Sequence, residues 1–246
     1  MAIDLLWHGF SSKPPYAWGE DIASYADQVL DLLDAEGIDR ASIEGESLGG
    51  WVGMWLALHH PDRVDRLILN TTAGIRWQPG SIAEKPHEGR DLLAQRSLQA
   101  INEPTRETIR RRLEWLMASP DRVTEELVEI RYRLYSDPEV QASLRSVFEN
   151  AFAGVGAPRK QIEEAELASI GAPTLVVWTD HNPGTGPDVG RRIADAIPGA
   201  RFALIEGAGH WPQWERPEEH DRIVMDFLAE DATGTAASVA GARAGG

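Results

Sequence analysis

Ser47 is the side chain whose setting most clearly indicates chemistry. It lies in GESLGG, residues 45–50, a G-x-S-x-G pattern. Residues 41–44 can enter as a buried strand and LGGWVGMWLALHH can leave as a helix, so the serine falls on a sharp strand-to-helix turn. Such a nucleophile elbow exposes the hydroxyl, and the N–H of Leu48 at the helix start can stabilise an oxyanion. The pattern predicts a nucleophilic serine.

His210 is the candidate general base. It stands in EGAGHWPQWERPEEH, residues 206–220, directly after an apolar run and a G-x-G turn. A histidine delivered in this way can take the proton of a serine or of a water molecule. We therefore expect His210 to act as base and Ser47 as nucleophile or as activator of water, with Trp211 bordering the pocket.

The elements that must hold these residues alternate along the chain. Apolar residues at helical spacing indicate a helix over about residues 19–36. Buried strands are indicated over residues 41–44, 65–70, 171–178 and 201–206. No strand signal appears from about 75 to 169, and prolines there separate helices over residues 91–101, 105–118, 124–136 and 138–152. The pattern indicates an α/β protein with an all-helical insertion.

Composition excludes several classes of function. The net charge of -15 argues against nucleic acid and anionic membranes as partners, and no apolar run approaches the ~20 residues of a membrane span. The chain has no cysteine and no cluster of metal ligands or phosphate-binding glycine loop. We expect a soluble cytoplasmic protein that acts on a small molecule without a metal or organic cofactor. Whether it forms a homo-oligomer stays open.

The motifs and their order resemble the alpha/beta-hydrolases. Residues 4–11 read D-x-x-W-H-G-x-S and are similar to the D-x-x-G-H-G-x-S segment after the fourth strand of that family, with Trp7 at its first glycine. GHWPQWE, residues 209–215, resembles the GHWAQWE-type ending of the meta-cleavage product hydrolases, which cleave carbon–carbon bonds in vinylogous diketo acids from aromatic degradation. The resemblance covers nearly all of residues 1–230 and implies a serine hydrolase of that type.

The triad acid is the member that departs from the family. There it follows a strand as W-x-x-x-D-P, and this chain reads WTDHNP from Trp178, which puts Asn182 at the acid's position. An asparagine can orient His210 through its amide oxygen but brings no negative charge. Asp180 is the alternative if the loop bends differently.

The resemblance further implies an N-terminally incomplete sheet. If Asp4 ends the fourth strand, the interval to Ser47 holds one helix and one strand, and the first three strands and the early oxyanion loop are absent. Leu48 is then the remaining oxyanion donor, and loss of one donor typically costs on the order of 100- to 1,000-fold in rate. A catalytically impaired or non-catalytic truncated hydrolase is therefore one alternative.

The helical insertion resembles the cap that follows the sixth strand in this family. We expect the core to comprise residues 1–75 and 170–230, the cap residues 76–169, and a disordered tail residues 231–246. Arg131, in VEIRYRL, matches a cap arginine of the meta-cleavage hydrolases and would bind a substrate carboxylate. Because fold fixes neither substrate nor bond, a generic carboxylesterase, lactonase or haloperoxidase-like enzyme is the other alternative.

Overall fold

A parallel sheet forms the centre of the molecule. The computed structural model describes residues 1–16, 21–77, 88–153 and 160–230. In this part of the chain, four parallel strands pair in the order β1 (Ala41–Glu46), β2 (Val64–Asn70), β5 (Thr174–Thr179) and β6 (Arg201–Ile205). Gly45 lies opposite Leu69 of β2, and Leu69 lies opposite Val176 of β5. The four carboxyl ends therefore meet at one edge, where a parallel sheet usually binds its ligand.

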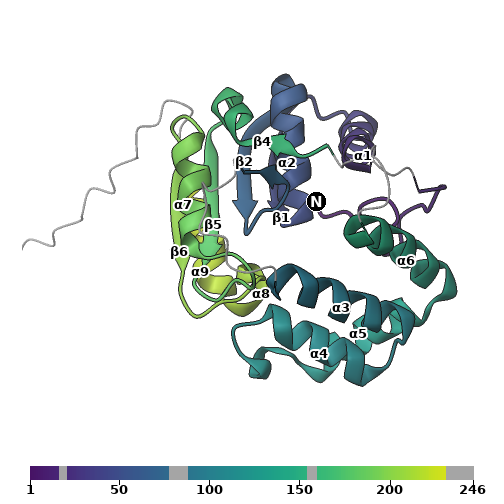
Figure 1. Cartoon of the computed structure of the whole chain (residues 1–246). Helices are drawn as coiled ribbons and strands as arrows, with labels where there is room; N and C mark the ends of the chain where they lie inside the picture. The colour runs from purple at the N-terminus through teal and green to yellow at the C-terminus, as the bar shows by residue number, and fades with distance from the viewer. Residues whose placement is uncertain (17–20, 78–87, 154–159, 231–246) are drawn as a thin grey trace, which may run out of the picture.

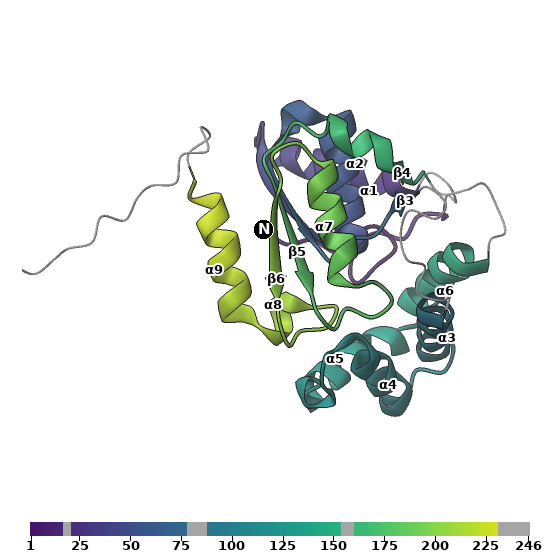
Figure 2. The same ribbon diagram turned by 60° about the vertical axis from the view of Figure 1, so that its left-hand side comes forward.

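Helices cover both faces of this sheet. On one face lie α1 (Asp21–Ala35), α2 (Leu48–His59) and α7 (Pro187–Ala196), and on the other lies α9 (Pro217–Leu228), which follows the short α8 (Pro212–Glu215) (Figure 2). Side chains alternate between the faces as strand geometry requires, so Leu67 and Leu69 pack on the first face and Ile68 packs on the second. The turn η1 (Pro61–Arg63) joins α2 to β2.

A second group of helices lies at the carboxyl edge of the sheet (Figure 1). It consists of α3 (Glu88–Asn102), α4 (Arg106–Leu116), α5 (Glu125–Ser136) and α6 (Pro138–Ala153), with the turn η2 (Pro120–Arg122) between α4 and α5. Its helices share a buried apolar cluster that includes Ile101, Leu113 and Val128. Thr105 and Thr124 cap α4 and α5 through their hydroxyls. None of the described helices is both long and apolar enough to span a membrane.

Two very short strands were not expected from the sequence. β3 (Ile75–Arg76) pairs in parallel with β4 (Ile162–Glu163), and the turn η3 (Glu164–Ser169) follows. Ile162 and Leu167 pack into the core on the α1, α2 and α7 face of the sheet, although residues 76–169 were expected to belong to the helical cap. A two-residue strand is too short to show a period of two, so the pattern could not reveal it.

The expectation that Asp4 ends a strand is wrong. Residues 1–5 form no strand, and the Asp4 carboxylate instead accepts a hydrogen bond of 2.9 Å from the N–H of Phe10. Trp7, at the family's glycine position, has φ of +65° and is buried, with its indole N–H donating to Pro14 O. Hydrogen bonds within the segment, from Phe10 N to the Asp4 carboxylate and from His8 N to Leu5 O, hold it as a local turn. The predicted tail, residues 231–246, lies outside the described residues.

Candidate active site

Ser47 occupies the predicted sharp turn. It follows the last residue of β1 and precedes the first residue of α2, with φ of +50° and ψ of -107°, a strained conformation for a residue other than glycine. Its N–H donates to Asn70 O at 3.0 Å. A Cβ atom on Gly45 would collide with the Gly49 carbonyl, and one on Gly50 would collide with Thr72. The glycines of the motif are therefore what allows the bend.

The start of α2 lies beside this hydroxyl. Ser47 is the residue before α2 and its side chain makes no capping hydrogen bond, so the hydroxyl is not committed to the helix end. Leu48 is the first helical residue, and the N–H groups of a first turn have no acceptor within the helix. The Leu48 N–H and the positive end of the helix dipole can therefore stabilise negative charge on an oxygen near Ser47.

Contacts with α4 and with the residue that follows β2 fix the loop that carries His210. The N–H of His210 donates to Leu116 O at 2.6 Å, and its carbonyl accepts from the Thr71 hydroxyl at 3.0 Å. Gly209 is required before it, because a Cβ there would collide with Leu116 O. No motif predicted the Thr71 contact, which joins residues 139 positions apart.

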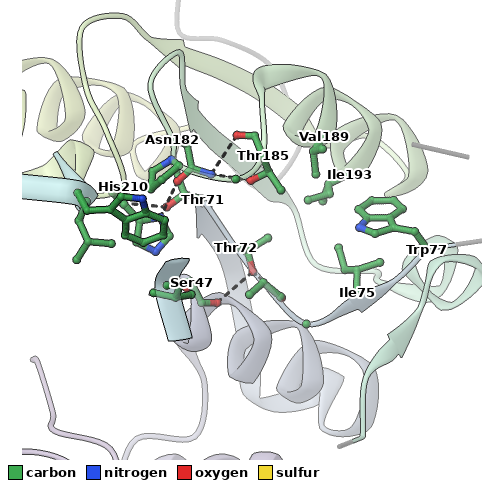
Figure 3. A pocket seen from close by; sticks show the side chains of 17 residues that line it. Ser47, Thr71, Thr72, Ile75, Trp77, Asn182, Thr185, Val189, Ile193 and His210 are labelled. Atoms are coloured by element: carbon green, nitrogen blue, oxygen red, sulfur yellow. Dashed lines mark hydrogen bonds between the residues drawn. The ribbon is translucent and has the colours of Figure 1, made fainter. Parts of the chain in front are cut away.

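Asn182 is the residue that orients the imidazole. Its Oδ1 lies 2.6 Å from Nδ1 of His210, while its amide nitrogen donates to the carbonyl and the hydroxyl of Thr185 at 3.2 and 2.6 Å (Figure 3). A carbonyl can only accept, so the amide nitrogen must face Thr185 and the amide oxygen must face His210. Nδ1 of His210 therefore carries a proton, and Nε2 is the nitrogen left for chemistry.

Asp180, the alternative acid, is engaged elsewhere. Its Oδ1 accepts from Gly207 N at 2.8 Å and lies 2.8 Å from Nδ1 of His181. Burial raises the pKa of Asp180, but the bonds from His181 and Gly207 outweigh burial and hold it below its ordinary value. Of the two candidates, Asn182 is the one in contact with His210.

Glu46 is a site residue that the motifs did not predict. Its Oε1 lies 2.8 Å from Nε2 of His210, although it precedes the nucleophile in the chain by one position. The same oxygen is buried and has no hydrogen-bond partner in the part of the chain that the structure describes, so the two atoms lie close together without a hydrogen bond. Among the described residues, no hydrogen bond joins the hydroxyl of Ser47 to His210. The one available signal was the position of Glu46 at the carboxyl end of a strand.

A cavity of about 400 Å³ opens beside these groups (Figure 3). Ser47, Asn182 and His210 lie at one side of it, and the opposite side is apolar. The apolar wall and the threonines between the two sides comprise Ile75, Trp77, Leu93, Val189, Ile193, Thr71, Thr72 and Thr185. Leu93, Trp115 and Leu116 come from α3 and α4, so these helices close the cavity at the sheet edge. The described residues include no group of three or more side chains arranged to hold a metal.

Arg131 and Trp211 lie next to each other outside the residues that line this cavity. The guanidinium of Arg131 stacks over the indole of Trp211 at 5.3 Å from the ring centre. Trp211 follows His210 directly and packs against the buried cluster of the α3–α6 helices. Their predicted role in substrate binding stays a prediction, because neither side chain is among the residues that line this cavity.

Glu215 connects the loop that carries His210 to the segment that follows α4. Its two carboxylate oxygens accept from Gly209 N at 2.6 Å and from Ala118 N at 2.8 Å, and its side chain is buried. Burial raises the pKa of Glu215, against the opposing effect of the two N–H donors. The carboxylate therefore couples the position of His210 to that of the segment after α4.

Comparison with known proteins agrees with this architecture. The family model described as the alpha/beta hydrolase fold matches residues 1–217. The 2-hydroxy-6-oxononadienedioate/2-hydroxy-6-oxononatrienedioate hydrolase of Paraburkholderia xenovorans is 32% identical over 220 residues, which cover 89% of this chain and 72% of that protein. Matches to further hydrolases of that name cover 66% and 65% of the relative, so the chain spans about two thirds of the length of these proteins.

Comparison with solved structures also indicates an alpha/beta-hydrolase related to the meta-cleavage product hydrolases. The meta-cleavage product hydrolase of Pseudomonas fluorescens has a TM-score of 0.75 and 26% identity, covering 92% of this chain and 77% of the other. An enol-lactonase from Burkholderia xenovorans has a TM-score of 0.70 and 26% identity, covering 92% and 79%. The chain belongs to the alpha/beta-hydrolase fold family, within which it is related to the meta-cleavage product hydrolases.

Proposed function

We propose that this protein is a serine-dependent hydrolase that cleaves a carbon–carbon bond in a vinylogous diketo acid formed by aromatic ring fission. The observation that carries the proposal is that Ser47, Asn182 and His210, from three separate loops at the carboxyl ends of strands, line one cavity. The relatives named for hydrolysis of such compounds support the same reaction class. The net charge of -15 disfavours binding to anionic membranes, and we propose that the protein acts in the cytoplasm.

The chemistry follows from the proton positions. With Nδ1–H of His210 donated to Asn182, Nε2 accepts the proton of the Ser47 hydroxyl or of a water that Ser47 holds. The resulting oxygen nucleophile attacks the ketone carbonyl, and the Leu48 N–H stabilises the oxyanion. Collapse of that oxyanion breaks the carbon–carbon bond, whose electron pair enters the conjugated diketo acid before that fragment takes up a proton. The other fragment leaves as a carboxylic acid once water has been added.

The cavity wall suits the remainder of such a substrate. Ile75, Trp77 and Ile193 offer an apolar surface to the hydrocarbon part. Under this proposal Arg131, beside Trp211, binds the substrate carboxylate by a charge-assisted contact.

Hydrolysis of a neutral ester or lactone is the second candidate. The observation that favours it is that the described residues lining the cavity include no lysine and no arginine. The structural similarity to an enol-lactonase agrees with this alternative.

The test compares two substrates on the same purified protein. Turnover of a dienoic diketo acid, followed by loss of its absorbance with both products identified by mass, is expected to exceed turnover of an aryl ester of similar size. Activity on the ester alone would select the second candidate. Activity on neither substrate by the folded protein would contradict both and favour a non-catalytic role.

A further inference from the structure

Thr71 has a backbone conformation that its residue type disfavours. It follows the last residue of β2, is buried, and has φ of +37°. Glycine adopts a positive φ readily, but a β-branched side chain crowds the backbone there, so the conformation lowers the stability of the fold. A strained residue keeps such a conformation only where its surroundings hold it, and strained residues gather at functional sites. The contacts of Thr71 therefore indicate its role.

Two hydrogen bonds connect Thr71 to the neighbouring strand and to the histidine. Its N–H donates to Val177 O at 3.0 Å, in continuation of the pairing of β2 with β5. Its hydroxyl donates to His210 O at 3.0 Å (Figure 3). Because the first bond fixes the Thr71 backbone to β5, the second bond fixes the His210 carbonyl to the sheet.

The backbone on either side of Thr71 holds the candidate nucleophile. The carbonyl of Asn70 accepts from Ser47 N at 3.0 Å, and the N–H of Ala73 donates to Ser47 O at 3.1 Å. Residues 70–73 thus contact Ser47 through their backbone and His210 through the Thr71 hydroxyl. This segment is therefore a direct structural connection between the candidate nucleophile and the candidate base.

Thr179 makes a similar contact from the neighbouring strand. It is the last residue of β5, it is buried, and its hydroxyl donates to Gly209 O at 2.6 Å. Threonine hydroxyls at the carboxyl ends of two adjacent strands therefore hold two successive carbonyls of the loop that carries His210. Of these two threonines, Thr71 is the one with a positive φ.

We infer that Thr71 is a positioning residue whose hydroxyl, held on a strained backbone, sets the position of His210 relative to Ser47. The inference rests on the proposed function of Ser47 and His210. Thr71 acts through the backbone of the histidine and takes no part in proton transfer. A glycine would adopt the same backbone without strain but would bring no hydroxyl. The threonine therefore lowers stability at this position while it keeps the imidazole aligned for turnover, which is sensitive to misplacement of about 1 Å.

Replacement of the hydroxyl alone tests this role. Thr71→Val keeps the shape and the β-branch, so kcat should fall about 10- to 100-fold with little change in KM. Thr71→Ser keeps the hydroxyl and should recover most of that kcat. Thr174→Val is the matched control, because the buried Thr174 hydroxyl also donates to a backbone carbonyl, that of Ala172 at 2.8 Å, but at the amino end of β5. It should lower Tm and leave kcat unchanged. The parent kcat in folded Thr71→Val would overturn the inference.

Thr71→Ala and Thr71→Gly separate alignment from stability. Neither variant has the hydroxyl, so both should lose at least as much kcat as Thr71→Val. Alanine remains strained at a positive φ and glycine does not, so the Tm of Thr71→Gly should exceed that of Thr71→Ala by about 2 °C or more. A kcat that followed Tm across these variants, with activity recovered in Thr71→Gly, would contradict a positioning role.

Hydrogen exchange tests the loop without any substrate. Amide exchange of residues 206–216 would be followed by mass spectrometry in the parent protein, in Thr71→Val and in Thr174→Val. We expect faster exchange in Thr71→Val alone, because the loop has lost one of the hydrogen bonds that hold it.

This measurement separates failure of the inference from failure of the proposed function. If Ser47→Ala leaves turnover intact while loop exchange depends on the Thr71 hydroxyl, the proposed function fails and the positioning of the loop stands. If Ser47→Ala abolishes turnover while Thr71→Val keeps the kcat and the exchange of the parent protein, the proposed function stands and the inference fails.

Discussion

Asn182→Asp is the change for which the structure gives the most explicit expectation. The substitution is isosteric and places a carboxylate oxygen 2.6 Å from the Nδ1–H of His210. An opposite charge at such a distance favours the imidazolium by about 1 to 3 pKa units, and each unit is a factor of ten. We therefore expect turnover to rise by about 10- to 1,000-fold, within the roughly 10,000-fold lost on the reverse change in a serine protease.

The same substitution should weaken the fold slightly. The second Asp oxygen would face the Thr185 carbonyl, which accepts from the amide at 3.2 Å in the parent protein. Loss of this bond and the acceptor–acceptor contact cost about 1 to 3 kcal/mol, or roughly 2 to 4 °C in Tm per kcal/mol. The assay is kcat at the pH plateau with Tm recorded beside it, and Asp180→Asn serves as control with little expected effect. No gain in turnover for Asn182→Asp, together with a large loss for Asp180→Asn, would refute this reasoning.

Three further changes test other parts of the site and the fold. Arg131→Ala should raise KM about 10-fold or more for a carboxylate-bearing substrate and hardly change it for a neutral ester, since a charge-assisted contact contributes about 1.5 to 3 kcal/mol; equal effects would mean that Arg131 supports the helical layer. Glu215→Gln should lower both Tm and kcat, because the NH2 group of a glutamine cannot accept a hydrogen bond from Gly209 or Ala118 as the second carboxylate oxygen does. An unchanged kcat would show that these two hydrogen bonds do not position His210. Burial lowers the pKa of His220, but Glu44 and Asp221 outweigh burial and raise it, while the His220 hydrogen bond is the main cause that lowers the pKa of Glu44. The His220 contribution to stability is full below its ordinary pKa and is lost as pH rises through the raised value; the Glu44 contribution is full above its ordinary pKa and is lost as pH falls through the lowered value. The pair should therefore stabilise most between about pH 4.5 and 6.5, and a His220→Gln urea titration should show its largest loss there, whereas a loss independent of pH would contradict the ionic pairing.

Local sequence signals were sufficient for the elements that carry the site. β1, α2, β5 and β6 form where apolar runs, glycines and prolines predicted them, within a few residues at each end. Ser47 and His210 could be identified because each is marked by its own short motif. Asn182 could be placed by its spacing from Trp178 and Pro183, and it does contact His210.

The features that were missed depend on contacts between distant segments. Glu46 and Thr71 meet His210 only after β6 has paired with β5, and no pattern within either segment encodes that approach. β3 and β4 form because they pair with each other, with insufficient length to show periodicity. The Asp4 carboxylate accepts from Phe10 N and closes a local turn, a contact that the D-x-x-W-H-G-x-S segment did not reveal.

We propose that Ser47 is the nucleophile of a hydrolytic reaction and that His210 is its base. Removal of the Ser47 hydroxyl is expected to leave the core unchanged. The decisive assay is turnover of a dienoic diketo acid by the parent protein and by Ser47→Ala, with both products confirmed by mass and the fold of each protein checked by Tm. We predict turnover in the parent protein, a loss on the order of 1,000-fold or more in Ser47→Ala, and nearly equal Tm values. Turnover that survives in folded Ser47→Ala, with the same products, would contradict the role of Ser47.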